Sequence, residues 1–146
     1  MEFLSKYIDL MIFGTLGAMG FIVITLGIER MLFFWTMKME NYKTLQDLEI
    51  DVSRNLTAIG AIGSNAPYVG LLGTVIGIII VFYDMGVSGN FETATIMAGL
   101  STALYATAMG LAVAIPSLVI HSFFVRKAQL KITIFERDNL EDRKWF

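Results

Sequence analysis

Three long stretches without a charged residue constrain the fold of this chain more than any other feature. They run from Leu10 to Ile28, from Asn55 to Tyr83 and from Thr93 to Val125. Each stretch can hold the roughly 20 apolar residues that a helix needs to cross about 30 Å of hydrocarbon. The 146 residues therefore predict an all-α integral membrane protein, a single membrane domain with three transmembrane helices.

The composition agrees with a membrane location and argues against an enzyme. Only 16% of the residues are charged, whereas a soluble domain usually has about 25%. The chain has no cysteine, which excludes disulfides and thiolate metal sites. It also lacks a metal-ligand cluster, a Ser/His/Asp set and paired carboxylates at membrane depth. We therefore expect no enzymatic activity, no cofactor, no metal and no nucleic-acid partner.

The charge pattern divides the chain into seven segments. The second and third uncharged stretches would be about 43 and 50 Å long as helices, so both are expected to project beyond the membrane. Glu29 and Arg30 are expected to form an exposed pair at the membrane boundary. The expected segments are an interfacial segment at 1–9, helices at 10–34, 55–83 and 93–125, a cytoplasmic loop at 36–54, a periplasmic turn at 84–92 and a cytoplasmic tail at 126–146.

The basic residues predict the orientation in the membrane. The loop at 36–54 and the tail at 126–146, together with Arg30, hold all but one of the eleven Lys and Arg residues. Only Lys6 lies on the other side. Because basic residues concentrate in cytoplasmic loops, the N-terminus is predicted to be periplasmic and the C-terminus cytoplasmic.

Two stripes of small residues mark the second and third helices as close-packing elements. Small residues spaced by three or four share one face of a helix and let another backbone approach closely. Pro67 and Pro116 are expected to bend these helices, because proline lacks a donor and clashes with the carbonyl four residues back. The stripes, interpreted as helix-packing and oligomer interfaces, are Gly63, Ala66, Gly70, Gly73 and Gly77 on the second helix and Gly99, Ala103, Ala106, Gly110 and Ala114 on the third.

Two motifs within these helices resemble a known family. Residues 66–77 read APYVGLLGTVIG, and residues 99–116 read GLSTALYATAMGLAVAIP. They are similar, in order and in spacing, to the second-helix and third-helix motifs of the ExbB/TolQ proteins, which are distantly akin to the flagellar stator MotA. The chain looks most like a short ExbB.

The resemblance implies a bacterial inner-membrane motor. It implies a homopentamer around a central pore that encloses the single transmembrane helix of an ExbD-like partner, with the membrane aspartate supplied by that partner. Such a complex uses the proton-motive force to energise a TonB-like protein and so outer-membrane uptake. By resemblance, Thr74 and Thr107 match the threonines that face the proton pathway.

The chain departs from the family at Thr102, where many members carry a glutamate. A helix turns 100° per residue, so Thr102 and Thr107 cannot both face one narrow pore, and Thr102 is expected at a helix contact with a structural hydroxyl. His121 is expected to be an interfacial residue and not a proton relay. Threonine hydroxyls can also simply bond to their own backbone. Two alternatives stay open: a TolQ-type subunit of the Tol-Pal envelope system, and a membrane scaffold without ion flux.

Overall fold

The computed structural model describes residues 2–89 and 92–143, and every regular element in these ranges is helical. Three helices are long and apolar enough to cross a membrane, which confirms the all-α prediction with three spans. A short helical pair, η1 and α2, connects the first span to the second. The elements are α1 at Glu2–Thr36, η1 at Met39–Asn41, α2 at Leu45–Ser53, α3 at Leu56–Ser88 and α4 at Thr93–Arg143.

The helices are longer than the uncharged stretches. The segment at 1–9 was expected to be a separate interfacial element, but α1 is continuous from Glu2. The tail is also helical, because α4 continues through the charged residues to Arg143 with no proline or glycine after Pro116. Charged and polar side chains such as Lys, Glu and Gln are good helix formers, so the end of an apolar stretch does not end a helix.

The ends of the second span are set by backbone geometry. α3 continues to Ser88, five residues beyond Tyr83, and ends at Gly89, whose φ of 65° is the left-handed conformation that favours glycine. Its N-terminus follows Asn55, which has a φ of 62°. The expected turn at 84–92 is therefore shorter, and its residues 90 and 91 lie outside the described part of the chain.

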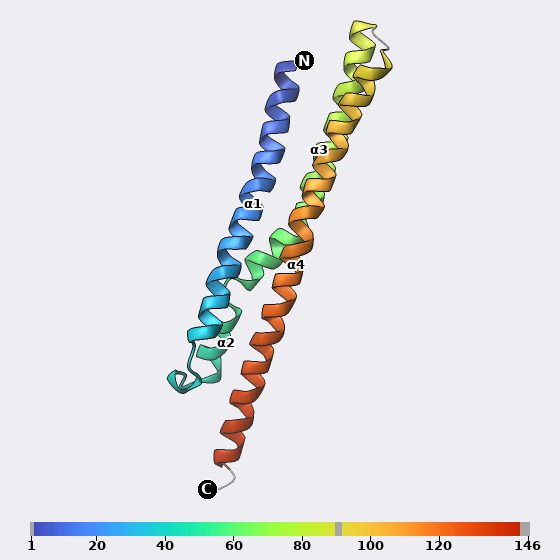
Figure 1. Ribbon diagram of the computed structural model, residues 1–146. Helices are drawn as coiled ribbons and strands as arrows, with labels where there is room; N and C mark the ends of the chain where they lie inside the picture. Colours follow the sequence, from blue (N-terminus) through green and yellow to red (C-terminus); the bar gives the residue numbers. More distant parts are fainter. Residues whose placement is uncertain (1, 90–91, 144–146) are drawn as a thin grey trace.

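The three long helices run side by side, and the most extensive contact is between α3 and α4 (Figure 1). The N-terminus lies at the same end of the bundle as the connection between α3 and α4, whereas α2 and the C-terminal end of α4 lie toward the other end (Figure 1). The basic loop and the basic tail therefore share one end of the molecule.

Two apolar clusters hold the helices together. The first, which we call the junction core, joins α1, α2, α3 and α4 at the basic end, and the rings of Phe34 and Phe124 stack there with centroids 5.7 Å apart. The second cluster lies farther from the basic end, where Ile12 and Leu16 of α1 pack with small residues of α3 and α4. The buried members of the junction core are Phe34, Leu48, Val52, Leu56, Phe124 and Ala128.

Arg30 is part of the junction and not an exposed boundary residue, so the expectation for it was wrong. Its side chain is 2% exposed. One end of the guanidinium donates to the Asp51 carbonyl at 2.8 Å, and the other donates to the Glu29 carboxylate at 2.7 Å. The Asn55 amide donates to the other oxygen of Glu29. Arg30 thus ties α1 to the end of α2, and Glu29 ties α1 to the start of α3.

Candidate functional site

The backbones of α3 and α4 approach each other closely at Gly70 and Gly110. A Cβ atom added to Gly70 would lie 2.6 Å from the Ala106 carbonyl oxygen, and one added to Gly110 would lie 2.7 Å from the Ala66 carbonyl oxygen. Real Cβ atoms essentially never come this close to a backbone atom. Only glycine fits at these two positions, which explains why two residues with poor helix propensity lie in the middle of long helices.

The predicted stripes on α3 and α4 lie against each other within one chain. Gly63 faces Ser117 and Leu118, Gly77 faces Ala103, and Gly99 faces Val81. Ala66, Ala103, Ala106 and Ala114 are buried, and Gly73 faces both Ala106 and Ile12 of α1. These stripes are used inside the monomer, so they do not by themselves require a second copy. Pro67 and Pro116 lie inside unbroken helices, and the bends expected there stay predictions.

Thr74 and Thr107 come together at this contact, one turn from Gly70. Their hydroxyl oxygens are 2.5 Å apart. The Thr74 hydroxyl also lies 2.8 Å from the Ala103 carbonyl oxygen, and each hydroxyl is 3.4 Å from the Gly70 carbonyl oxygen. Thr74 is buried at 8% exposure, whereas Thr107 is half-buried. Thr107 is therefore the more exposed member of the pair.

The distances assign the protons of the pair. A hydroxyl has one proton to donate, and a carbonyl oxygen can only accept. The Thr74 proton goes to the Ala103 carbonyl, its nearer acceptor. The 2.5 Å contact is then donated by Thr107 to the Thr74 oxygen. In this arrangement Thr107 keeps its own lone pairs free to accept a hydrogen bond from a group outside the chain.

Neither of the two helix segments that carry the threonines contains a charged residue. The stretches at 55–83 and 93–125, which carry the two threonines, contain no Asp, Glu, Lys or Arg. Within residues 2–89 and 92–143, no three His, Asp or Glu side chains gather in a way that could hold a metal ion. The pair can accept and donate hydrogen bonds, but the segments at 55–83 and 93–125 supply no carboxylate or basic side chain beside it.

The other predicted polar residues lie elsewhere. Thr102 is exposed, and its hydroxyl donates to the Ala98 carbonyl at 3.1 Å. A backbone bond fits the structural role predicted for this hydroxyl, and the helix contact expected for Thr102 stays a prediction. His121 is half-buried, with its Nδ1 2.8 Å from the Leu56 carbonyl oxygen. Since a carbonyl only accepts, Nδ1 carries the proton, and the ring ties α4 to the first turn of α3.

The sequence pattern of a known family covers most of this structure, including the threonine pair, the glycine crossing and most of the junction core. The profile of the MotA/TolQ/ExbB proton channel family matches residues 35–137. The chain belongs to this family. The match covers the whole of α2 and α3 and most of α4, so the close α3–α4 contact is its central structural feature within the matched range.

Several curated relatives are similar to this chain. A Helicobacter pylori protein named biopolymer transport protein ExbB is 48% identical over 89% of this chain and 90% of its own length. A protein of the same name from Aquifex aeolicus is 47% identical over 93% of this chain and 92% of its own length. The ExbB of Neisseria gonorrhoeae is 40% identical, but the aligned part is only 34% of its length. The chain thus aligns with nearly the whole of the first two relatives and with about a third of the Neisseria protein.

The sequence interpretation missed two features of the structure, the contact between Gly60 and His121 and the burial of Arg30. Gly60 faces the His121 ring, and a Cβ there would lie 2.7 Å from the ring. The signal was present, because Gly60 lies three residues before Gly63 and extends the same stripe. The burial of Arg30 had no such signal, since it depends on α2 folding back beside α1.

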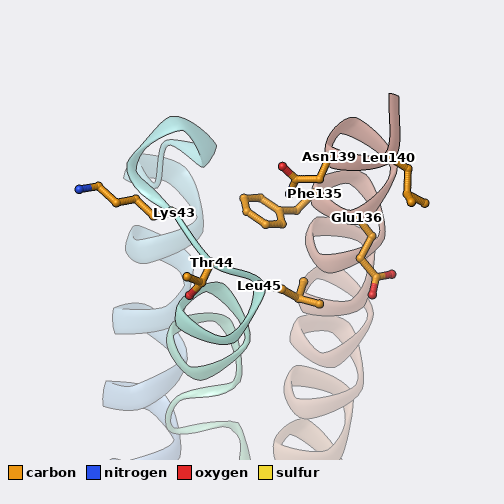
Figure 2. Close-up of a pocket in the computed structure, with 7 residues that line it drawn as sticks. All are labelled: Lys43, Thr44, Leu45, Phe135, Glu136, Asn139 and Leu140. Carbon is orange, nitrogen blue, oxygen red and sulfur yellow. The ribbon is translucent and has the colours of Figure 1, made fainter. Parts of the chain in front are cut away.

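A hollow of about 560 Å³ lies outside the membrane-depth region, between the start of α2 and the last turns of α4. Figure 2 shows Leu45 and Phe135 pointing toward one another across it, with Asn139 above. It is far along α4 from the threonine pair, and none of the predicted site residues lines it.

Proposed function

We propose that this chain is the proton-channel and scaffold subunit of an ExbB–ExbD-type motor of the bacterial inner membrane, which uses the proton-motive force to energise TonB-dependent uptake. Membership of the proton channel family and the names of the two full-length relatives support this role. The homopentamer, the ExbD-like partner with its membrane aspartate, and the TonB-like protein are parts of the proposal that rest on the family resemblance.

The observation that carries the proposal is the linked pair of hydroxyls at membrane depth. An ionised carboxylate in hydrocarbon costs on the order of 3 kcal/mol on insertion scales. A neighbouring hydroxyl can accept a hydrogen bond from the protonated acid and donate one to the ionised form. Thr107 is the more exposed of the two threonines, and in our proposal it is the one that contacts the partner aspartate. In our proposal, the Thr107 hydroxyl stops donating to Thr74 and donates to the partner aspartate when that aspartate ionises.

A scaffold without ion flux is the second candidate, and the burial of Thr74 favours it. The Thr74 hydroxyl is satisfied by the Ala103 carbonyl within its own chain. If the pair serves only to join α3 to α4, removal of either hydroxyl should affect assembly and not transport. The TolQ-type role has the same site, and a neighbouring gene for a TonB-like or a Tol-Pal protein would separate it from the uptake role.

Valine substitutions separate the channel from the scaffold. Valine nearly keeps the shape of threonine and deletes the hydroxyl. Thr107→Val should lower energised uptake and proton flux about tenfold or more, because a hydrogen bond to a charged group is worth about 1.5–3 kcal/mol. Thr74→Val should have a smaller effect, since its hydroxyl is buried and reaches the partner only through Thr107.

The matched control is Thr102→Val, which deletes an exposed hydroxyl that is bonded to its own helix. It should transport at the parental rate. All variants would be compared as purified complexes with a normal content of partner protein. Parental transport by Thr107→Val, alone and combined with Thr74→Val, would exclude the channel role of the pair and leave the scaffold.

We also propose the topology with the N-terminus in the periplasm. Single cysteines at Ser5, Ser88 and Asn139 would be exposed to an impermeant thiol reagent in intact spheroplasts. Ser5→Cys and Ser88→Cys should react, and Asn139→Cys should react only after the membrane is opened. Labelling of Asn139→Cys in intact spheroplasts would reverse the assignment. Asn139 is a sensitive reporter because it is exposed near the C-terminal end of α4.

A further inference from the structure

An apolar groove lies between α1 and α4 near the basic end of the bundle. Its volume is about 340 Å³, and its lining has no polar surface. Gly27 of α1 leaves room for it, Phe124 of α4 is buried beneath it, and Ile28, Met31, Val119 and Phe123 are half-exposed or more along its edges. In a membrane-spanning chain, a groove of this kind can be filled by hydrocarbon.

A cation and an aromatic ring lie at the end of the groove that leads out of the membrane. The Lys127 ammonium lies 4.7 Å from the centre of the Phe123 ring, which lines the groove. Lys127 and Arg126 are the first charged residues of α4, and the first acidic residue is ten positions later at Glu136. On α1, Trp35 follows Met31 by one turn and is 83% exposed. The apolar lining therefore leads directly to a positively charged, aromatic boundary.

We infer that this groove binds an anionic phospholipid. One acyl chain lies between Gly27 and Val119, and the phosphate lies beside the Lys127 ammonium, with the Trp35 ring at the level of the headgroup. Basic pockets between helices on the cytoplasmic side favour anionic headgroups, and tryptophan favours the same depth. The Lys127 stem runs along apolar surface while its charge stays at the interface. Charge complementarity, together with the wholly apolar lining, identifies a lipid and not a polar ligand.

The experiment uses photoreactive lipids and the complete complex in membrane discs. Phosphatidylglycerol and phosphatidylcholine with the same diazirine-bearing acyl chain would be incorporated in parallel, and the labelled residues would be mapped by peptide mass spectrometry. The anionic lipid should label the segments at 27–31 and 119–124 more strongly than the neutral lipid. Lys127→Gln should reduce this preference about fivefold, since one basic residue near an anionic surface contributes about 1 kcal/mol.

Two further variants test the shape of the groove and the specificity of the charge. Val119→Trp should fill the groove and reduce labelling by both lipids, whereas Leu104→Trp, at a similarly exposed position of α4 outside the groove, should not. Arg137→Gln removes an exposed charge farther along the same helix and should leave the lipid preference unchanged. If Val119→Trp fails to assemble, Lys127→Gln decides the question.

Three outcomes would overturn the inference. Equal labelling by the two lipids would remove the role of the headgroup. Labelling spread evenly over the exposed apolar faces would remove the site. Absence of labelling at residues 27–31 and 119–124 by either lipid, with other exposed apolar faces labelled, would show that a second copy or a partner helix covers the groove.

Discussion

The α3–α4 contact and the junction core hold helices together in opposite ways. At the contact, backbones meet at Gly70 and Gly110 with almost no side chain between them. At the junction, large side chains such as Phe34, Leu48 and Phe124 fill the space. The difference follows from the surroundings. Within lipid, burying an apolar side chain gains little because lipid is as apolar as leucine, and close van der Waals contact dominates. Where water is present, removing apolar surface from it provides the stabilisation.

The two regions therefore differ in which substitutions destabilise them. Shortening a large side chain of the junction core should lower the free energy of unfolding strongly. The α3–α4 contact has almost no side chain to shorten, but it has no space for an added one. Three substitutions, in order of decreasing effect on the free energy of unfolding, test this contrast.

Leu48→Ala should have the largest effect. Leu48 is fully buried in the junction core, and truncation of such a residue costs about 2–5 kcal/mol through lost burial and the cavity that remains. Denaturation of the complex in mild detergent, followed by helix content, measures the loss. Ile50→Ala is the control, because Ile50 is 67% exposed two residues away. Equal losses in the two variants would mean that the junction is not a packed core.

Arg30→Lys should destabilise the same region by about 1.5–3 kcal/mol. The planar guanidinium donates to the Asp51 carbonyl with one nitrogen and to Glu29 with another. Lysine has a single nitrogen at the end of an unbranched side chain, so it cannot replace both hydrogen bonds in this geometry. The control is Arg137→Lys, whose ion pair with Asp138 is exposed at both partners and contributes about 1 kcal/mol or less. An unchanged unfolding midpoint in Arg30→Lys would show that the two hydrogen bonds of Arg30 do not contribute to the stability of the junction.

Gly70→Ala should have the smallest net effect of the three, a loss of about 2 kcal/mol or less. Overpacking costs about 1–3 kcal/mol, and the better helix propensity of alanine returns up to about 1 kcal/mol. Gly86→Ala is the control, since nothing lies within 4 Å of a Cβ at that position; this variant should gain stability. Stabilisation by Gly70→Ala as well would show that α3 and α4 do not meet as closely as described.

The contact leaves more trace in the sequence than the junction does, for a physical reason. A stripe of glycine and alanine at steps of three and four is local information, and in the structure these residues lie where α3 and α4 meet. It did not identify which glycines meet, because that depends on the crossing point of two helices. Thr74 and Thr107 were chosen by resemblance, and their direct contact required the register of α3 against α4.

The junction depends on chain reversal, which no periodic pattern encodes. The left-handed backbone at Asn55 lets α2 and α3 be separate helices, and α2 then reaches both α1 and α4. Arg30 next to an aromatic run looked like a boundary residue, because its hydrogen-bond partner, the Asp51 carbonyl, lies on a segment that appeared to be a polar loop. The backbone oxygen of a residue far along the chain leaves no trace in the sequence.

The sparse attachment of α1 has a consequence for biosynthesis. Its deep contacts are with late residues; Ile12, for example, faces Gly73, which is synthesised roughly 3–12 s later at about 5–20 residues per second. During that time α1 has to remain in the bilayer without its partners. Two hydroxyls in the middle of α1 need no partner from another helix during this time. Thr15 donates to the Met11 carbonyl and Thr25 to the Phe21 carbonyl of the same helix. The nascent first helix can therefore stay in lipid without an unmet donor from these side chains until the hairpin of α3 and α4 arrives.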